Sequence, residues 1–232
     1  MKMKTFKHIF LPFEIPKLKV VQNNEGRRFY VVPNGNSYPS ITTVIDFWQK
    51  DNIMKWRNRV GEEEAERVRL HTSKRGTKVH KMCDDYLSNK SDIVKGHESD
   101  HITLFEKLGE HFESVDNIHL QEEALFSNEL GIAGRVDCIA EFNGKLSIID
   151  FKTKGYPQKL EWMGKHFVQC AAYAEMWEER MKDMPIQQLV LMVTPEDGNA
   201  QIFTEDRETY KNSRIETLKN IIQEFNNGST PK

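Results

Sequence analysis

The stretch Gly131–Lys154, GIAGRVDCIAEFNGKLSIIDFKTK, decides the fold that we expect for this chain. Two runs rich in apolar residues, 135–142 and 145–153, flank the dipeptide Asn143-Gly144. Asn-Gly between two such runs is a strong signal for a two-residue hairpin turn, because both turn positions require positive φ. The stretch therefore predicts a β-hairpin at the centre of the molecule.

The hairpin register predicts a cluster of charge on one face. If Phe142 faces Lys145, then Asp137 faces Asp150, and Lys152 follows on the same face. Opposed side chains have Cβ atoms roughly 5 Å apart, so the two carboxylates repel each other unless a proton or a divalent cation binds between them. The alternative is a surface hairpin with scattered charge. The opposite face is predicted to pack in the core, with Val136, Cys138, Ala140, Phe142, Ile149 and Phe151.

The rest of the chain sets the class of protein. With 232 residues, 38% hydrophobic and 29% charged, it is long enough for one domain with a sizeable core. We expect one domain over 1–232, in which 1–117 is an N-terminal hairpin and helical part, 118–205 a catalytic core, and 206–232 a closing helix and tail. No apolar run approaches the ~20 residues of a membrane-spanning helix, and the N-terminus lacks the pattern of a signal peptide. The three cysteines have no metal or redox spacing and are expected to be free and mostly buried.

The motifs in the hairpin resemble those of a known family. Gly134-Arg-Val-Asp137 and Asp150-Phe-Lys152 are similar to the GxxD and (D/E)xK motifs of the PD-(D/E)XK nuclease superfamily. The closest resemblance is to its RecB-like exonuclease branch, which includes the mitochondrial genome maintenance exonucleases and many phage nucleases. The resemblance implies an α/β, restriction-endonuclease-like core, with a small mixed sheet flanked by helices and a helical N-terminal wall. It also implies that Asp137 and Asp150 bind a catalytic Mg²⁺ or Mn²⁺ and that Lys152 assists at the scissile phosphate.

Two further segments match the same branch. Arg75-Gly-Thr-Lys-Val-His80 resembles its RGTxxH segment, which implies that His80 reaches the metal. Gln169 and Tyr173 lie one helical turn apart, as in its QxxxY motif, which implies DNA contact or orientation of catalytic groups. Taken alone, a lone histidine or a Gln-Tyr pair on a helix is more often structural.

Residues 52–88 are predicted to form helices that face DNA. They interleave many lysines and arginines, including Arg75 and Lys78, with aromatic residues such as Trp56. The alternative is a solvated face whose charges are balanced by the glutamates at 62–64 and 66.

The other predicted elements follow in chain order. We expect an extended arm over 5–21, a short hairpin near 27–36, and a helix after the N-cap Ser40. Further helices are predicted over 99–115, 159–180 and 208–225, strands over 119–126, 188–194 and 200–204, and a frayed tail over 226–232. An acidic residue on the 119–126 strand is expected beside Asp137. Glu123 is preferred over Glu122 because it shares a face with Leu125.

The expected function is metal-dependent hydrolysis of DNA, from the ends of single strands, in DNA repair or recombination or in a phage. The alternatives are a structure-specific endonuclease or a catalytically silent DNA-binding subunit of the same fold. A monomer is favoured, with no membrane partner, in the cytoplasm of a bacterium or phage-infected cell; a mitochondrial location stays open. The sequence does not distinguish the polarity of cleavage, DNA from RNA, or one metal ion from two.

Overall fold

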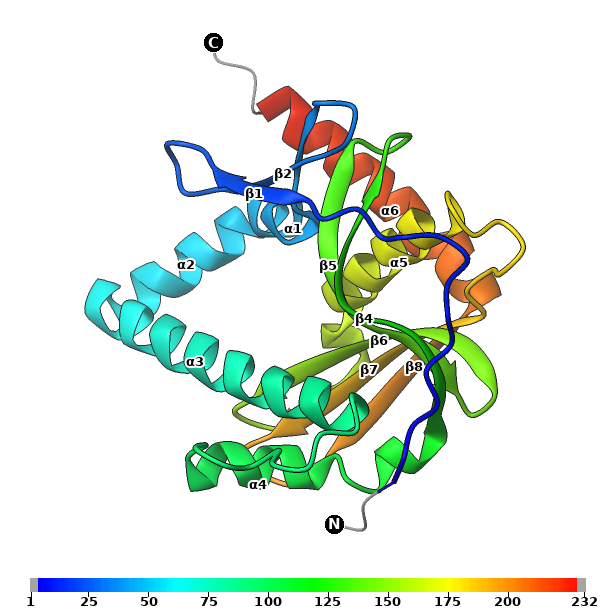
Figure 1. Ribbon diagram of the computed structural model, residues 1–232. Coiled ribbons are helices and arrows are strands. Elements are labelled where there is room, and N and C mark those ends of the chain that lie inside the picture. Colours follow the sequence, from blue (N-terminus) through cyan, green and yellow to red (C-terminus); the bar gives the residue numbers. More distant parts are fainter. Residues whose placement is uncertain (1–3, 229–232) are drawn as a thin grey trace.

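The computed structural model describes residues 4–228. The centre of the molecule is a mixed five-stranded sheet (Figure 1). Its order is β4-β5-β6-β7-β8, and β6 and β7 are parallel whereas the other neighbours are antiparallel. Helix α5 connects the two parallel strands, as a parallel pair requires. The strands are β4 (Val115–Ser127), β5 (Ile132–Phe142), β6 (Lys145–Lys154), β7 (Gln188–Pro195) and β8 (Gln201–Asp206).

The predicted hairpin is confirmed, and so is its register as far as the ladder extends, but the predicted pair of Asp137 with Asp150 is not part of that ladder. Phe142 pairs with Lys145 and Cys138 pairs with Ile149, on either side of an Asn-Gly turn with positive φ at both positions. The β5–β6 ladder ends at the Cys138–Ile149 pair. Beyond it β5, still paired with β4, diverges from β6, while β6 continues alongside β7 (Figure 1). The two predicted metal ligands, Asp137 and Asp150, therefore lie just past the last pair, where the strands separate.

Helices cover both faces of the sheet (Figure 1). One hydrophobic core lies between the sheet and α1 (Ile41–Trp48), α5 (Gly164–Glu178) and α6 (Arg207–Gly228). A second lies between the sheet and α3 (Glu62–Leu87) with α4 (Ser99–Lys107).

The face predicted for one core residue, Val136, is wrong, although the residue is buried as expected. Val136 packs in the first core, whereas Cys138 and Phe151 pack in the second. Strict alternation along β5 fails at the point where its pairing with β6 ends.

The N-terminal part adds a small sheet and a helical wall. Strands β1 (Lys19–Gln22), β2 (Arg28–Val31) and β3 (Ser37–Pro39) pair antiparallel, and α1 follows with Ser40 as its N-cap, as predicted. Helix α2 (Lys50–Val60) then runs out from the body of the molecule and α3 returns to it, so that the two form the arms of a V (Figure 1). The region 52–88 is thus helical in two pieces.

Several element boundaries differ from prediction. Helix α4 ends at Lys107, after which a short 3₁₀ helix (His111–Ser114) leads directly into β4, because Gly109 interrupts the apolar periodicity. A second 3₁₀ helix (Leu160–Trp162) precedes α5, which begins only at Gly164. Helix α6 continues to Gly228, so 226–228 are not frayed; 229–232 lie outside the described residues. The three cysteines are free and buried, as expected.

Within residues 4–228, none of the helices has the length and apolar character needed to cross a membrane.

Candidate active site and metal centre

Five of the predicted site residues line one cavity of about 600 Å³: His80, Asp137, Lys152, Gln169 and Tyr173. It opens where β5 and β6 separate and is bounded by elements from both halves of the chain. Its lining residues are Arg28, Tyr30, Thr42, Gly76, Thr77, His80, Lys81, Asp84, Glu122, Arg135, Asp137, Lys152, Gln169 and Tyr173.

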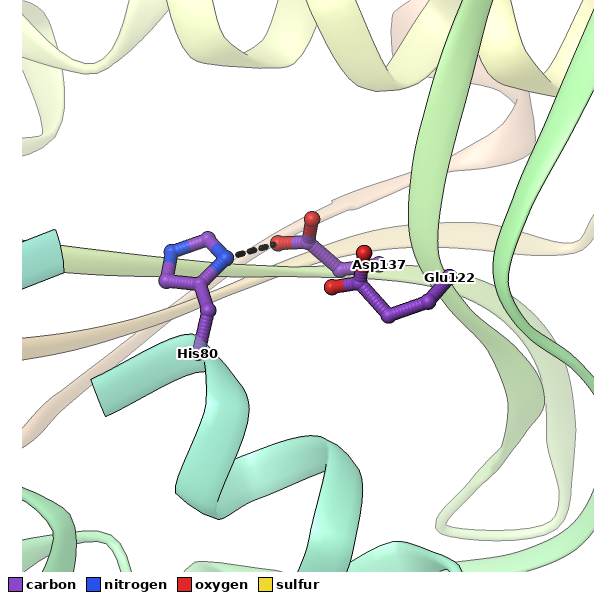
Figure 2. A group of neighbouring side chains, drawn as sticks. All are labelled: His80, Glu122 and Asp137. Carbon is purple, nitrogen blue, oxygen red and sulfur yellow. Dashed lines mark ion pairs between the residues drawn. The ribbon is translucent and has the colours of Figure 1, made fainter. Parts of the chain in front are cut away.

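Three potential metal ligands meet in this cavity. His80 from α3, Glu122 from β4 and Asp137 from β5 point toward one another (Figure 2), and their ligand atoms lie within 4.8 Å of each other. His80 Nδ1 is 3.3 Å from Asp137 Oδ2, and the same oxygen accepts a 2.9 Å hydrogen bond from the backbone N–H of Phe151. This bond ties the carboxylate of one hairpin strand to the backbone of the other.

The acidic residue on β4 is Glu122, and the preference for Glu123 was wrong. Glu122 has a positive φ of 49°, which is uncommon for a residue other than glycine, and it interrupts the alternation of the strand. Leu120, before Glu122, and Leu125, after it, both face the α5 side of the sheet. The residues that face this side are therefore even-numbered just before Glu122 and odd-numbered after it. As a result Glu122 faces the cavity, whereas the side chain of Glu123 is exposed.

Asp150 lies deeper than the three cavity ligands. Its side chain is 1% exposed and forms an ion pair with Lys152. Gln169 Nε2 lies 3.2 Å from both Asp150 Oδ1 and Tyr173 Oη, so the two residues of the QxxxY segment contact each other and the carboxylate. Asp150 is not in the group of three close donors, and its role as a metal ligand stays a prediction.

A comparison with family models matches residues 101–231, more than half of the chain, to the PD-(D/E)XK nuclease superfamily. The chain belongs to this superfamily. The matched segment contains Asp137, Asp150 and Lys152, which the sequence motifs had indicated, and it begins after His80.

Curated relatives of this PD-(D/E)XK protein are found in mammals. Mitochondrial genome maintenance exonuclease 1 of Mus musculus is 26% identical over 133 residues, which cover 54% of this chain and 39% of the relative. The Homo sapiens protein of the same name is 25% identical over 132 residues, 53% of this chain and 38% of the relative. The match thus spans about two fifths of the length of either relative. A solved structure of a protein assigned as an exonuclease, from Eubacterium rectale, superposes with a TM-score of 0.45 and 11% identity, covering 68% of this chain and 69% of that chain.

Burial and mutual charge perturb the acids of the PD-(D/E)XK site. Burial raises the pKa of Glu122 to about 7, and the nearby charge of Asp137 adds to this. Burial also raises the pKa of Asp150 to about 6, against the opposing effect of Lys152. For Asp137, burial alone would raise the pKa, but His80 and Lys152 outweigh it and hold the pKa below its usual range. The cavity therefore concentrates negative charge that a cation would stabilise.

The donor set fits a divalent cation. Two carboxylates and one imidazole converge from three different elements, and a further carboxylate lies behind them. Oxygen-rich sites with few protein ligands suit Mg²⁺ and Mn²⁺. His80, Glu122 and Asp137 would hold the ion.

We expect Mg²⁺ to raise the melting temperature more at pH 8 than at pH 6. Without metal, the folded state binds protons at Glu122 and Asp150 more tightly than the unfolded state, so these groups contribute less stability as the pH rises from about 4 to about 7. At pH 8 both carboxylates are mostly ionised, and Glu122 is then available to Mg²⁺. At about 100 times its Kd, a bound ion stabilises by about 2.7 kcal/mol. Thermal unfolding with and without Mg²⁺ at the two pH values measures the difference.

Adjacent glutamates provide the control for this expectation. Glu122→Gln should weaken Mg²⁺ binding at pH 8 by tenfold or more, which corresponds to a loss of about 1.4 kcal/mol of the Mg²⁺-dependent stabilisation. Glu123→Gln, with the same chemical change one residue away on the exposed side, should leave the shift intact. Equal effects of the two substitutions would contradict the assignment of Glu122.

The glycine of the GxxD segment has a packing role. A Cβ atom at Gly134 would lie 2.8 Å from Cε1 of Tyr173 and 3.0 Å from Cγ2 of Ile41, and both side chains are buried. The absence of a side chain at Gly134 thus lets the QxxxY tyrosine reach Gln169. This links the GxxD and QxxxY motifs of the superfamily by direct contact.

Gly134→Ala should destabilise the fold by about 1–3 kcal/mol, because overpacking forces buried side chains out of their positions. Gly76→Ala, inside helix α3, is the matched control from another motif. A Cβ atom at Gly76 would meet only Thr153 Oγ1, at a distance of 3.7 Å. There alanine should be neutral or stabilise by up to about 1 kcal/mol. Chemical denaturation of both variants measures the contrast, and equal destabilisation would refute the packing argument.

The predicted DNA-binding residues of the helical wall separate into different environments. Arg75 is 4% exposed and forms an ion pair with Glu196, so it links α3 to the β7–β8 turn. Its guanidinium is buried there, and the predicted DNA contact of Arg75 is wrong. Lys78 is exposed and does not line the cavity. The ion pair with Lys74 lowers the pKa of Glu98, and the charge of Lys78 adds a smaller contribution. Trp56 is half-buried on α2.

The charge-balanced alternative is correct for three arginines of the wall. The pairs Arg57–Glu62, Arg67–Glu64 and Arg69–Glu66 are ion pairs.

Sequence reasoning missed the contribution of the N-terminal sheet to the site. Arg28 and Tyr30 of β2 and Thr42 of α1 line the cavity. The strand at Arg28 was predicted, and its alternation places Arg28 and Tyr30 on one face, but nothing in the sequence indicates which way that face points.

Proposed function

We propose that the protein hydrolyses phosphodiester bonds of DNA in a metal-dependent reaction that starts from the ends of single strands. The observation that carries the proposal is the convergence of His80, Glu122 and Asp137 in a cavity that Lys152 also lines. Membership of the PD-(D/E)XK superfamily supports nuclease chemistry, and the names of the mammalian relatives support exonuclease action.

The roles of the residues follow from their positions. A bound divalent ion supplies a water of lowered pKa and positive charge for the phosphate. His80, Glu122 and Asp137 hold that ion, and Asp150 adds negative charge behind it. The Lys152 ammonium, anchored by Asp150, offers positive charge to a phosphate oxygen. Gln169 donates to Asp150 and so keeps this carboxylate directed at the lysine.

The restriction to single-stranded ends rests on the helical wall. Helices α2 and α3 project as a V beside the sheet (Figure 1), and none of the α2 residues is buried. Among residues 4–228, Lys55 and Arg59 on α2 lack an ion-pair partner, and Trp56 lies between them in the sequence. A cationic helix with an aromatic residue suits a single strand, whose bases stack on aromatic rings. A strand that passes between this wall and the sheet must thread from an end.

The test offers the purified protein equal amounts of end-labelled linear single strands, closed single-stranded circles and blunt duplex, with Mg²⁺, with Mn²⁺ and with excess EDTA. We expect degradation of linear single strands only, and none in EDTA. Cleavage of circles as fast as linear strands would rule out threading and indicate an endonuclease. Binding without cleavage of any substrate would indicate a silent DNA-binding subunit.

A further inference from the structure

The connection between β6 and α5 exposes an unusual amount of apolar surface. Tyr156, Leu160 and Trp162 are 63%, 57% and 46% exposed, all within seven residues of sequence. The rings of Tyr156 and Trp162 contact each other edge to face, with centroids 6.4 Å apart and an interplanar angle of 85°. Two ordered aromatic rings therefore face solvent directly after the strand that carries Asp150 and Lys152.

One lysine lies over the Trp162 ring, and two more flank the segment in the sequence. Lys159 Nζ lies 5.3 Å from the centroid of the Trp162 ring, and Lys165 is exposed at the start of α5. Lys154 Nζ lies 3.1 Å from Nε2 of His166. The segment 154–166 holds three lysines against one glutamate, Glu161, so its net charge is positive; outside it, Asp46 lies near Lys165.

Among residues 4–228, Lys154 has no ion-pair partner, and the more distant charge of Asp150 only partly opposes the fall of its pKa. Burial lowers the pKa of Lys154 to about 8, and the neighbouring charges of Lys165 and Lys152 add to this. Burial and the same lysines also hold the pKa of His166 well below its usual range. An anion such as a phosphate would relieve this repulsion.

This surface is continuous with the candidate active site. Lys154 follows Lys152 by two residues on β6 and so points to the same face of the strand. His166 precedes Gln169 by three residues on α5 and lies on the same side of the helix. Thr153, between the two lysines, lies beside Gly76 of the α3 wall. A strand that leaves the cavity along β6 meets Lys154 first and the aromatic pair next.

We infer that the surface formed by Lys154, Tyr156, Lys159, Trp162, Lys165 and His166, here called the β6–α5 platform, binds the single strand next to the cleaved phosphate. A base stacks on the aromatic pair, and the lysines contact the backbone phosphates. This binding is independent of base sequence, because every base has a π-face. The inference rests on the proposed function for its class of ligand, single-stranded nucleic acid.

The first experiment measures the binding of fluorescein-labelled oligo(dT) of twelve nucleotides by anisotropy in EDTA, where cleavage does not interfere. Trp162→Ala should weaken binding by about 5- to 100-fold, the range for loss of one stacked base. Trp162→Phe, which keeps an aromatic ring, should recover most of the affinity. Phe10→Ala is the matched control, since Phe10 is fully exposed but lies on the N-terminal arm, and it should bind as the wild type does.

The second experiment measures the salt dependence of the same binding. Lys165→Ala should reduce the slope of log K against log salt by about 0.7, the value for one phosphate contact with a single strand. Lys219→Ala, an exposed lysine on α6, should leave the slope unchanged. In Mg²⁺, Trp162→Ala should raise KM for the oligonucleotide more than it lowers kcat, because stacking is equal in the ground and transition states.

The outcomes separate this inference from the proposed function. Wild-type protein that binds oligo(dT) but cleaves nothing refutes the proposed catalysis and still supports the platform if Trp162→Ala binds more weakly. Wild-type affinity and salt slope in Trp162→Ala and Lys165→Ala overturn the platform and leave the catalysis standing.

Discussion

Asp137→Asn should lower the rate of cleavage of a single-stranded oligonucleotide at saturating Mg²⁺ by about 10³-fold or more, equivalent to at least about 4 kcal/mol of transition-state stabilisation. Asparagine has the same shape, and its amide oxygen can still accept the hydrogen bond from the Phe151 N–H. Its neutral amide, however, is a poor ligand for a hard cation next to His80 and Glu122. Initial rates over a Mg²⁺ titration measure the effect.

Asp84→Asn is the matched control for this variant. Asp84 lines the same cavity, yet its side chain accepts a hydrogen bond from Gln121 and lies outside the group of three close donors. We expect it to lose less than about tenfold in rate. Equal losses in the two variants, or more than a tenth of wild-type activity in Asp137→Asn, would contradict the proposed metal centre.

The pKa of His80 reports the charge at position 137 in a measurement that does not require catalytic activity. In the metal-free protein, burial lowers the pKa of His80, but the charge of Asp137 outweighs it and raises the pKa above its ordinary value. In Asp137→Asn, burial and Lys152 still lower the pKa of His80 and only the smaller effect of Asp150 opposes them, so the His80 pKa should fall. An NMR titration of the histidine side chains measures this change and also shows whether the variant is folded.

Lys152→Met should lower kcat by about 10²- to 10³-fold, the usual effect of removing one group that stabilises transition-state charge. Methionine fills a similar volume with no charge, so the buried site stays packed. The Lys152 side chain is 15% exposed and lines the cavity, so its ammonium can reach a bound phosphate while Asp150 anchors it.

The same variant should move the pH dependence of cleavage to higher pH. Burial raises the pKa of Asp150 to about 6, and Lys152 opposes this rise. Without the lysine, the pKa of Asp150 rises further, so the carboxyl holds its proton at neutral pH and its negative charge appears only at more alkaline pH. A pH–rate profile of kcat for the wild type and Lys152→Met measures this displacement.

Two controls accompany Lys152→Met. Lys152→Arg restores a charge at this position and should recover the pH profile more fully than the rate, because its guanidinium has a different geometry. Lys81→Met removes a cation that lines the same cavity but forms ion pairs with Asp84 and Asp85 on its own helix. It should cost less than about tenfold in kcat. A Lys152→Met enzyme with wild-type rates would remove the lysine from the mechanism.

Local signals in the sequence determined the hairpin and the order of the motifs. The Asn143-Gly144 turn requires positive φ at both positions, and that requirement alone sets the pairing of Phe142 with Lys145 and of Cys138 with Ile149. The sequence likewise predicted a helical wall over 52–88 in two or three pieces, of which the structure has two. Ser40 was recognised as an N-cap because capping involves only neighbouring residues. Membership of the PD-(D/E)XK superfamily was also predicted from the sequence, because the GxxD and (D/E)xK motifs lie at hairpin spacing.

Only the tertiary structure decided which side chains enter the site. Glu122 rather than Glu123 faces the cavity because its backbone takes a positive φ that reverses the alternation of β4, and a glutamate carries no sequence signal for that conformation. Arg75 is buried against Glu196, which is distant in sequence. Gly134 needs to be a glycine because Tyr173, from a helix that follows later in the chain, packs against it. For Arg75 and Gly134 the deciding contact joins residues far apart in the chain, which carry no periodic or local signal, so it exists only once the chain is folded.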